Sequence, residues 1–253
     1  MTRETDALPG LEQLWAEAPA ASGRLFDPAM ARDLPEPARR YLTHTITPGT
    51  PLARSVHLHM RGEIFLNKWL EFEAEQVIVW DRGLIWRARV DQGLLTIKGF
   101  DRIVDGVGEM RWRLLGLIPV LTATGPDITR SAKGRHEIES VLIPSVFVGD
   151  ATRWSSSDHD HADVSVRHGD QEGQVHLSLD DTGGLRSAWL ERWGNPDGGD
   201  FSEVPFGVVA VEEGRFGGYT IPSKIRVGWH YREGGFDEDG EFFRAELTAV
   251  EYR

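Results

Sequence analysis

The clearest pattern in the chain is an alternation of apolar and polar side chains that begins at Ser55. The apolar members of its first segment are Val56, Leu58 and Met60, and the polar members are His57, His59 and Arg61. A period of two is typical of a β-strand with one covered face and one wetter face. Short turns rich in glycine, such as 81–83 and 91–93, join successive segments. The pattern therefore predicts an antiparallel meander.

The same alternation continues through most of the remaining chain, so we expect about nine to eleven strands. The expected strands lie at 69–80, 84–90, 94–101, 110–121, 153–154, 162–168, 174–181, 185–193, 208–212, 215–220, 224–231 and 241–251. One helix near 128–142 interrupts them and ends before Pro144.

The first fifty residues follow helical spacing instead. Leu11, Leu14 and Trp15 share one helix face, Asp27-Pro28 resembles a helix start, and a second helix is expected over 37–44. We therefore predict a helical segment over 1–50 that packs on a single curved β domain over 51–253. The fold class is α+β and sheet-dominated: a curved antiparallel half-barrel with an inserted helix and short N-terminal helices.

The composition excludes several classes of site and partner, but it does not assign a function. The 253 residues include 40 acidic and 28 basic side chains, a net charge of −12, and no cysteine. The missing cysteines exclude disulfides, cysteine-ligated metals and a thiol nucleophile. The acidic balance disfavours nucleic acid as a partner. No apolar run approaches the roughly 20 residues of a membrane-spanning helix. The first ten residues lack the apolar core of a secretory signal, so we expect a cytoplasmic protein.

Several short motifs resemble a family of bacterial proteins of unknown function, many of them actinobacterial. The matching pieces are Gly99-Phe-Asp101, Asp105-Gly-Val-Gly-Glu-Met110, 111–119, Leu34-Pro-Glu-Pro-Ala-Arg-Arg-Tyr-Leu42, Trp69 with Gln76, Trp86-Arg-Ala88, Arg135 with Glu139 and Pro144, Gly218-Tyr-Thr-Ile-Pro222 and Trp229. Together they extend over roughly residues 34–252, and none of them is a catalytic signature.

The chain departs from that family at two points. Many members carry N-terminal membrane segments, and their helix usually reads Arg-Tyr-Leu-Ala-Glu where this chain has Arg135-His-Glu-Ile-Glu139. The order of strands, inserted helix and later Gly…Ile-Pro strands is also similar to lipoprotein carriers of the LolA/LolB type. That resemblance implies a curved, incomplete barrel that cups an apolar ligand.

Candidate ligand-binding residues come from the tryptophans and from one helix face. Of the nine tryptophans, most are expected in the core, with Trp86 and Trp229 as cleft candidates beside Gln76 and Arg87. Arg135 and Glu139 lie one helical turn apart and so share a face. If that face lies on the concave side of the sheet, the pair is buried there and can orient a polar group, with Asp101 as a further candidate.

Metal and cofactor chemistry have little support. His159 and His161 share one strand face and are the only metal candidates, and a solvated loop explains them as well. His136-Glu137 begins like a zinc-protease motif, but Ser140 occupies the position of the second histidine. We expect no cofactor.

Three hypotheses remain open at this point. The leading one is the binding of a small apolar or amphipathic molecule, because a curved sheet must cover its concave face. The second is an interaction or scaffold protein, with a homodimer formed through the sheet. The third is an acid–base enzyme that uses Asp101, Arg135 and Glu139.

Overall fold

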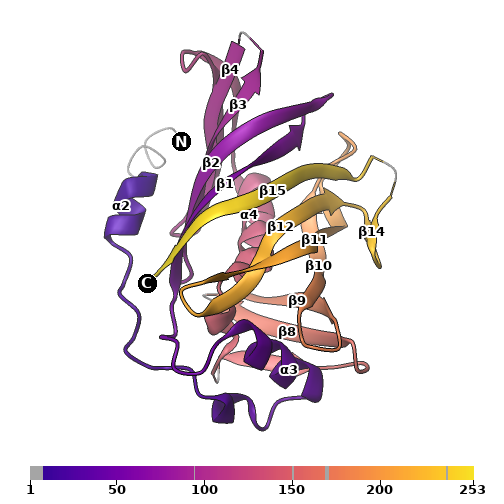
Figure 1. The fold of residues 1–253 in the computed structure, drawn as a ribbon. Coiled ribbons are helices and arrows are strands. Elements are labelled where there is room, and N and C mark those ends of the chain that lie inside the picture. The colour runs from indigo at the N-terminus through magenta and orange to yellow at the C-terminus, as the bar shows by residue number, and fades with distance from the viewer. Residues whose placement is uncertain (1–7, 94, 150, 169–170, 238) are drawn as a thin grey trace.

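The structure is a computed structural model that describes residues 8–93, 95–149, 151–168, 171–237 and 239–253. One large antiparallel sheet curls around a single helix (Figure 1). The helices are α2 (Leu11–Ala16), α3 (Glu36–Thr45) and α4 (Pro126–Ile138), with 3₁₀ turns η1 (Pro28–Ala31), η2 (Glu139–Leu142) and η3 (Pro144–Phe147). None of the described helices is long and apolar enough to cross a membrane.

The sheet contains thirteen strands in the order β6-β5-β4-β3-β2-β1-β15-β12-β11-β10-β9-β8-β7, and β13 and β14 form a separate ribbon. The strands are β1 (Ser55–Phe65), β2 (Trp69–Val79), β3 (Gly83–Gln92), β4 (Leu95–Val104), β5 (Val107–Leu114), β6 (Ile118–Thr124), β7 (Thr152–Ser155), β8 (His161–His168), β9 (Gln171–Leu179), β10 (Leu185–Gly194), β11 (Ser202–Phe216), β12 (Tyr219–Trp229), β13 (Tyr231–Arg232), β14 (Gly235–Phe236) and β15 (Glu241–Tyr252).

Two meanders make up this sheet, and the last strand joins them. β1 to β6 form one wing and β7 to β12 form the other. β15 lies between β1 and β12, with Val56 opposite Tyr252. The predicted curved antiparallel sheet with an inserted helix is thus confirmed.

The sheet has more strands than the expected nine to eleven, and some of the expected segments differ from the strands observed. The segments 208–212 and 215–220 are not separate strands, because β11 runs through the first and into the second. The segment 110–121 divides into β5 and β6 at a turn where Leu115 and Gly116 have φ angles of 52° and 73°. The turn lies inside an apolar run, so no polar residues marked it in the sequence. The expected helix is also shorter, because α4 ends at Ile138 and continues as the 3₁₀ turn η2.

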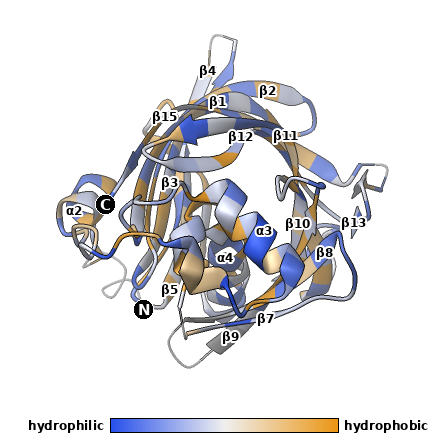
Figure 2. Cartoon of the chain, turned by 60° about the horizontal axis from the view of Figure 1, so that its bottom comes forward, coloured by the Kyte–Doolittle hydropathy of each residue, from blue (hydrophilic) through white to orange (hydrophobic). Residues whose placement is uncertain are grey.

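The two faces of the sheet have different partners. α4 lies across the concave face, where it packs mainly on β10 and β5 (Figure 1). α2 packs on the opposite face, where Leu11 and Leu14 meet Val77, Val79 and Ile85. α3 lies across the lower end of the curved sheet, as the view from below shows (Figure 2). Asp27 caps η1 by accepting from the Ala29 backbone N–H at 2.8 Å, at the expected start.

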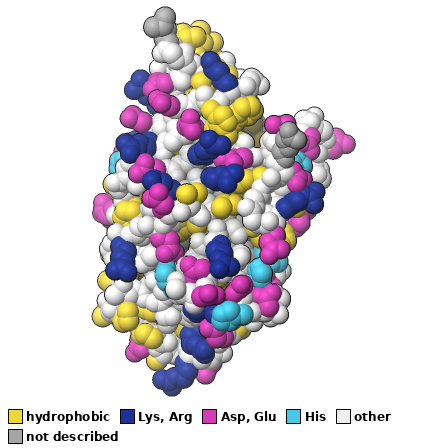
Figure 3. All heavy atoms as spheres, turned by 45° about the vertical axis from the view of Figure 1, so that its right-hand side comes forward, with side chains coloured by type: hydrophobic (Ala, Val, Ile, Leu, Met, Phe, Trp, Pro, Cys, Tyr) yellow, Lys and Arg dark blue, Asp and Glu magenta, His cyan; other side chains and the backbone are white. Residues whose placement is uncertain are grey.

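On the face that Figure 3 shows, charged side chains of both signs are interspersed, and a group of hydrophobic side chains lies near its top. The exposed large hydrophobic residues lie mostly at the hairpin ends of the first wing. These are Phe65, Leu66, Leu95, Leu115, Leu117, Ile118, Val120 and Leu121. They come from the β1–β2, β3–β4 and β5–β6 connections, which antiparallel pairing places at the same end of the sheet.

Glu137 of α4 provides a test of how the helix packs on the second wing. Its carboxyl carbon lies against Gly173 of β9, where an added Cβ would be only 2.3 Å away. Burial raises the pKa of Glu137 from 4.5 to about 7. The folded state therefore holds this proton more tightly than the unfolded state. The raised pKa costs stability as the pH rises from about 4.5 to about 7.

We expect Glu137→Gln to unfold at higher urea concentration than the wild type at pH 8, by about 1–3 kcal/mol, and to match it near pH 4. Urea titrations across this pH range measure the difference. The exposed Glu191→Gln serves as the control and should show no such trend. A Glu137→Gln effect that is independent of pH would contradict a buried carboxyl.

Candidate functional site

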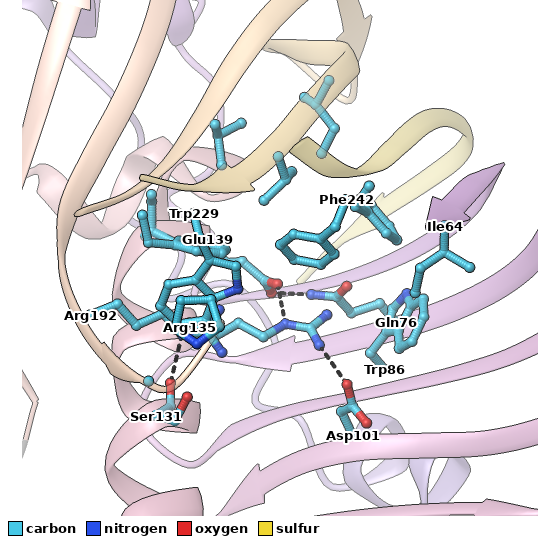
Figure 4. Close-up of a pocket in the computed structure, with 18 of the residues that line it drawn as sticks. Ile64, Gln76, Trp86, Asp101, Ser131, Arg135, Glu139, Arg192, Trp229 and Phe242 are labelled. Carbon is cyan, nitrogen blue, oxygen red and sulfur yellow. Dashed lines mark hydrogen bonds and ion pairs between the residues drawn. The ribbon is translucent and has the colours of Figure 1, made fainter. Parts of the chain in front are cut away.

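A cavity of about 330 Å³ lies between α4 and the concave face of the sheet (Figure 4). Its wall is mainly apolar and includes side chains from both wings. The apolar members are Met60, Ile64, Trp86, Met110, Ile128, Ile138, Val141, Leu142, Pro196, Phe201, Phe206, Val208, Ile225, Val227, Trp229, Phe242, Phe243 and Leu247. The polar members are Gln76, Asp101, Ser131, Arg135, Glu139, Arg192 and Asn195, with Gly194 beside them. A volume of this size is at the small end of the range for ligand pockets.

Strand register places one row of side chains across the first wing. Gln76 of β2 is opposite Trp86 of β3, Trp86 is opposite Asp101 of β4, and Asp101 is opposite Met110 of β5. Directly opposed residues point to the same face of a sheet. All four therefore reach the cavity.

Arg135 of α4 lies over this row and connects its polar members. Its Nε donates to Glu139 Oε1 at 2.7 Å, and its Nη1 lies 3.3 Å from Asp101 Oδ2. The Gln76 amide donates to the other oxygen of Glu139, and Trp112 Nε1 donates to Asp101 Oδ1 at 2.8 Å. Each of the four carboxylate oxygens thus accepts a hydrogen bond.

The charges in this network hold one another in place. Burial raises the pKa of Asp101, although Arg135 and Trp112 oppose this by stabilising the carboxylate. Burial also disfavours the charged form of Arg135, but Glu139 and Asp101 outweigh it and raise the pKa of the guanidinium. The three side chains are only 14–21% exposed. The network is therefore a partly buried set of ions that depends on its own members for compensation.

The second wing contributes a different cation. Arg192 of β10 donates from Nε to the backbone oxygen of Ser131 at 3.0 Å. Its guanidinium carbon lies 4.4 Å from the ring centre of Phe206 and 4.9 Å from that of Trp229. Gly194 allows Trp229 to take this position, because an added Cβ would lie 2.3 Å from the indole ring.

Of the seven residues singled out as binding candidates in the sequence, six line the cavity: Gln76, Trp86, Asp101, Arg135, Glu139 and Trp229. Arg87 does not. It lies on the other face of β3, where it pairs with Glu12 of α2 at 2.6 Å and with Glu75 at 2.8 Å. Neighbouring residues of a strand point to opposite faces, so Trp86 and Arg87 cannot share one cleft.

Arg192 and the phenylalanines of the second wing were missed. Arg192 follows the buried Ala188 and Leu190 in steps of two, which places a charged side chain on the apolar face of its strand. This alternation with Ala188 and Leu190 could have identified Arg192 in the sequence. It becomes informative only when the face of β10 that lines the concave side is known.

The histidine candidates are separated rather than gathered. His161 Nδ1 lies 2.8 Å from Asp158, whereas His159 contacts Arg40 and Glu36. His159 comes near Asp160 and Asp181 instead of His161, in an exposed group. His57 packs against the ring of Trp15 on the face of the sheet that α2 covers.

Replacement of Arg135 tests the network. We expect Arg135→Met to lower the free energy of unfolding by about 3–5 kcal/mol, because it leaves two partly buried carboxylates without their cation. Urea denaturation at pH 7 measures the change. The exposed Arg130, which pairs with Glu203, supplies the matched control Arg130→Met, for which we expect a change below about 1 kcal/mol. Equal effects of the two substitutions would contradict the network as described.

Comparisons with solved structures find similar folds at low sequence identity. A putative outer membrane lipoprotein-sorting protein domain from Vibrio parahaemolyticus has a TM-score of 0.42 and 8% identity, covering 79% of this chain and 85% of that one. A LolA superfamily protein from Nitrosomonas europaea has a TM-score of 0.45 and 10% identity, covering 86% and 92%. A DUF1329 family protein from Desulfovibrio piger has a TM-score of 0.40 and 11% identity, covering 79% and 86%.

The search of curated proteins finds no match. The family described as a family of unknown function, DUF6544, matches residues 24–238, which include every strand of the first wing and every residue that lines the cavity except Phe242, Phe243 and Leu247. The chain therefore belongs to the DUF6544 family.

Proposed function

We propose that this protein binds a small apolar or amphipathic molecule in the cavity between α4 and the concave face of the sheet. The observation that carries the proposal is the wall of the cavity. Aromatic and aliphatic side chains from both wings surround about 330 Å³, and a few polar groups converge at one side. That combination is typical of small-molecule sites, in which apolar area supplies affinity and polar groups fix orientation.

The acid–base alternative draws less support from the same residues. Asp101, Arg135 and Glu139 do lie together, as that hypothesis required. Their carboxylate oxygens, however, already accept from Arg135, Trp112 and Gln76. A general base needs a lone pair directed at its substrate, so this network suits positioning better than proton transfer.

A neutral chain molecule provides the direct test. We expect decan-1-ol to bind the purified protein with one site by isothermal titration calorimetry. Val227→Trp, which fills the cavity, should weaken binding about tenfold or more, because the apolar area available to the ligand is lost. Val211 lies on an exposed strand position, and Val211→Trp serves as the matched control that retains binding.

Native mass spectrometry adds an independent measurement. A mass excess that disappears on denaturation would reveal a molecule that purifies with the protein. If the wild type shows no mass excess and also binds neither decan-1-ol nor a charged amphiphile of similar chain length, the ligand-binding function is rejected.

A further inference from the structure

We propose that the ligand is an amphiphile with a single carboxylate head group, and that Arg192 binds this head group. The inference rests on the proposed binding function and adds the chemistry of the ligand. It starts from the unequal partners of the two cavity arginines.

Arg192 is a cation that has no ion-pair partner among the described residues. A guanidinium has five N–H donors. In Arg192 only Nε has a partner, the backbone oxygen of Ser131. Arg192 forms no ion pair with any residue that the structure describes, whereas Arg135 has two carboxylates. The terminal nitrogens of Arg192 are left free at the cavity wall.

The surroundings of Arg192 make this arrangement costly. Its stem packs on Gly134 of α4, where an added Cβ would lie 3.0 Å from Cγ, and its head lies over the rings of Phe206 and Trp229. Burial, followed by the charge of Arg135, lowers the pKa of the guanidinium, although the negative charges of Glu139 and Asp101 oppose this. The side chain is half-buried, and these two acids act on it only at a distance, because neither forms an ion pair with it.

The acids of the cavity form no ion pair with Arg192, because their oxygens are directed at other donors. Each carboxylate oxygen of Asp101 and Glu139 accepts a hydrogen bond from another residue. The unused hydrogen-bonding capacity of Arg192 is all for donation, so the missing group is an acceptor.

A carboxylate matches this requirement better than a phosphate. The planar fork of one guanidinium fits one carboxylate through two parallel hydrogen bonds. A phosphate monoester would bring close to two negative charges beside Asp101 and Glu139, and only Arg192 is free to compensate them. The apolar remainder of the cavity fits the chain of such an amphiphile.

Four probes with nearly equal chain lengths and different head groups separate the two proposals. Decanoate, decan-1-ol and decyltrimethylammonium are titrated into the wild type by calorimetry at pH 7.5. We expect decanoate to bind about 10- to 100-fold more tightly than decan-1-ol, and decyltrimethylammonium to bind weakest. Decyl phosphate is the fourth probe and should bind less tightly than decanoate.

Variants assign the preference to one side chain. Arg192→Met keeps the stem and should reduce decanoate affinity to that of decan-1-ol, while decan-1-ol affinity changes less than about twofold. Arg192→Lys keeps the charge without the fork and should recover part of the preference. Arg130→Met, an exposed arginine outside the cavity, is the control and should leave both affinities unchanged.

The outcomes distinguish the two proposals. Equal binding of decanoate and decan-1-ol would overturn the head-group assignment and leave the binding function intact. A preference for decanoate that survives Arg192→Met, or a stronger affinity for decyl phosphate, would also overturn the assignment. Failure of all the probes would reject the binding function itself.

Discussion

The pairing of β1 with β15 is the interaction on which the rest of the structure depends. Each wing of the sheet is a local meander whose strands follow one another in sequence. β15 alone connects them, since it pairs with β1 on one side and β12 on the other. This junction makes the two wings one continuous curved sheet, and α4 packs between them on β10 and β5. The cavity draws its walls from both wings and is therefore a product of the same contact.

The cavity combines two kinds of wall that ordinary core packing would not combine. A core of apolar side chains would be at least as stable as the ion network of Asp101, Arg135 and Glu139, because buried charges lose their hydration. The hydrogen bonds of this network satisfy both of its carboxylates, whereas the terminal nitrogens of Arg192, from the second wing, have no partner among the described residues. The acids of the cavity are thus satisfied by protein donors, whereas Arg192 still has hydrogen-bond donors to offer. This asymmetry gives a bound molecule an orientation.

Much of this could be predicted from the sequence, because period and spacing are local properties. The alternation from Ser55 onward predicted the sheet. The spacing of Arg135 and Glu139 placed both on one helix face, and the condition that this face lie on the concave side is met. The error with Arg87 came from grouping neighbours in sequence, although alternation sends Trp86 and Arg87 to opposite faces. Arg192 could not be found, because its role depends on which face of β10 meets α4. That is a long-range property which no local pattern contains.

Because β15 follows all other strands of the sheet in sequence, the sheet can be completed only late in the synthesis of the chain. Every other strand of the sheet leaves the ribosome before β15 does. Until then both meanders carry an unpaired edge, at β1 and at β12, where Val56, Leu58 and Val227 have no partner strand. Such edges are the usual starting points of aggregation in unfinished chains. The contact that closes the sheet also joins residues far apart in sequence, as Val56 and Tyr252 are, and contacts of that kind form slowly. The nascent chain therefore has a period of vulnerability that ends only when its final strand inserts into the centre of the sheet.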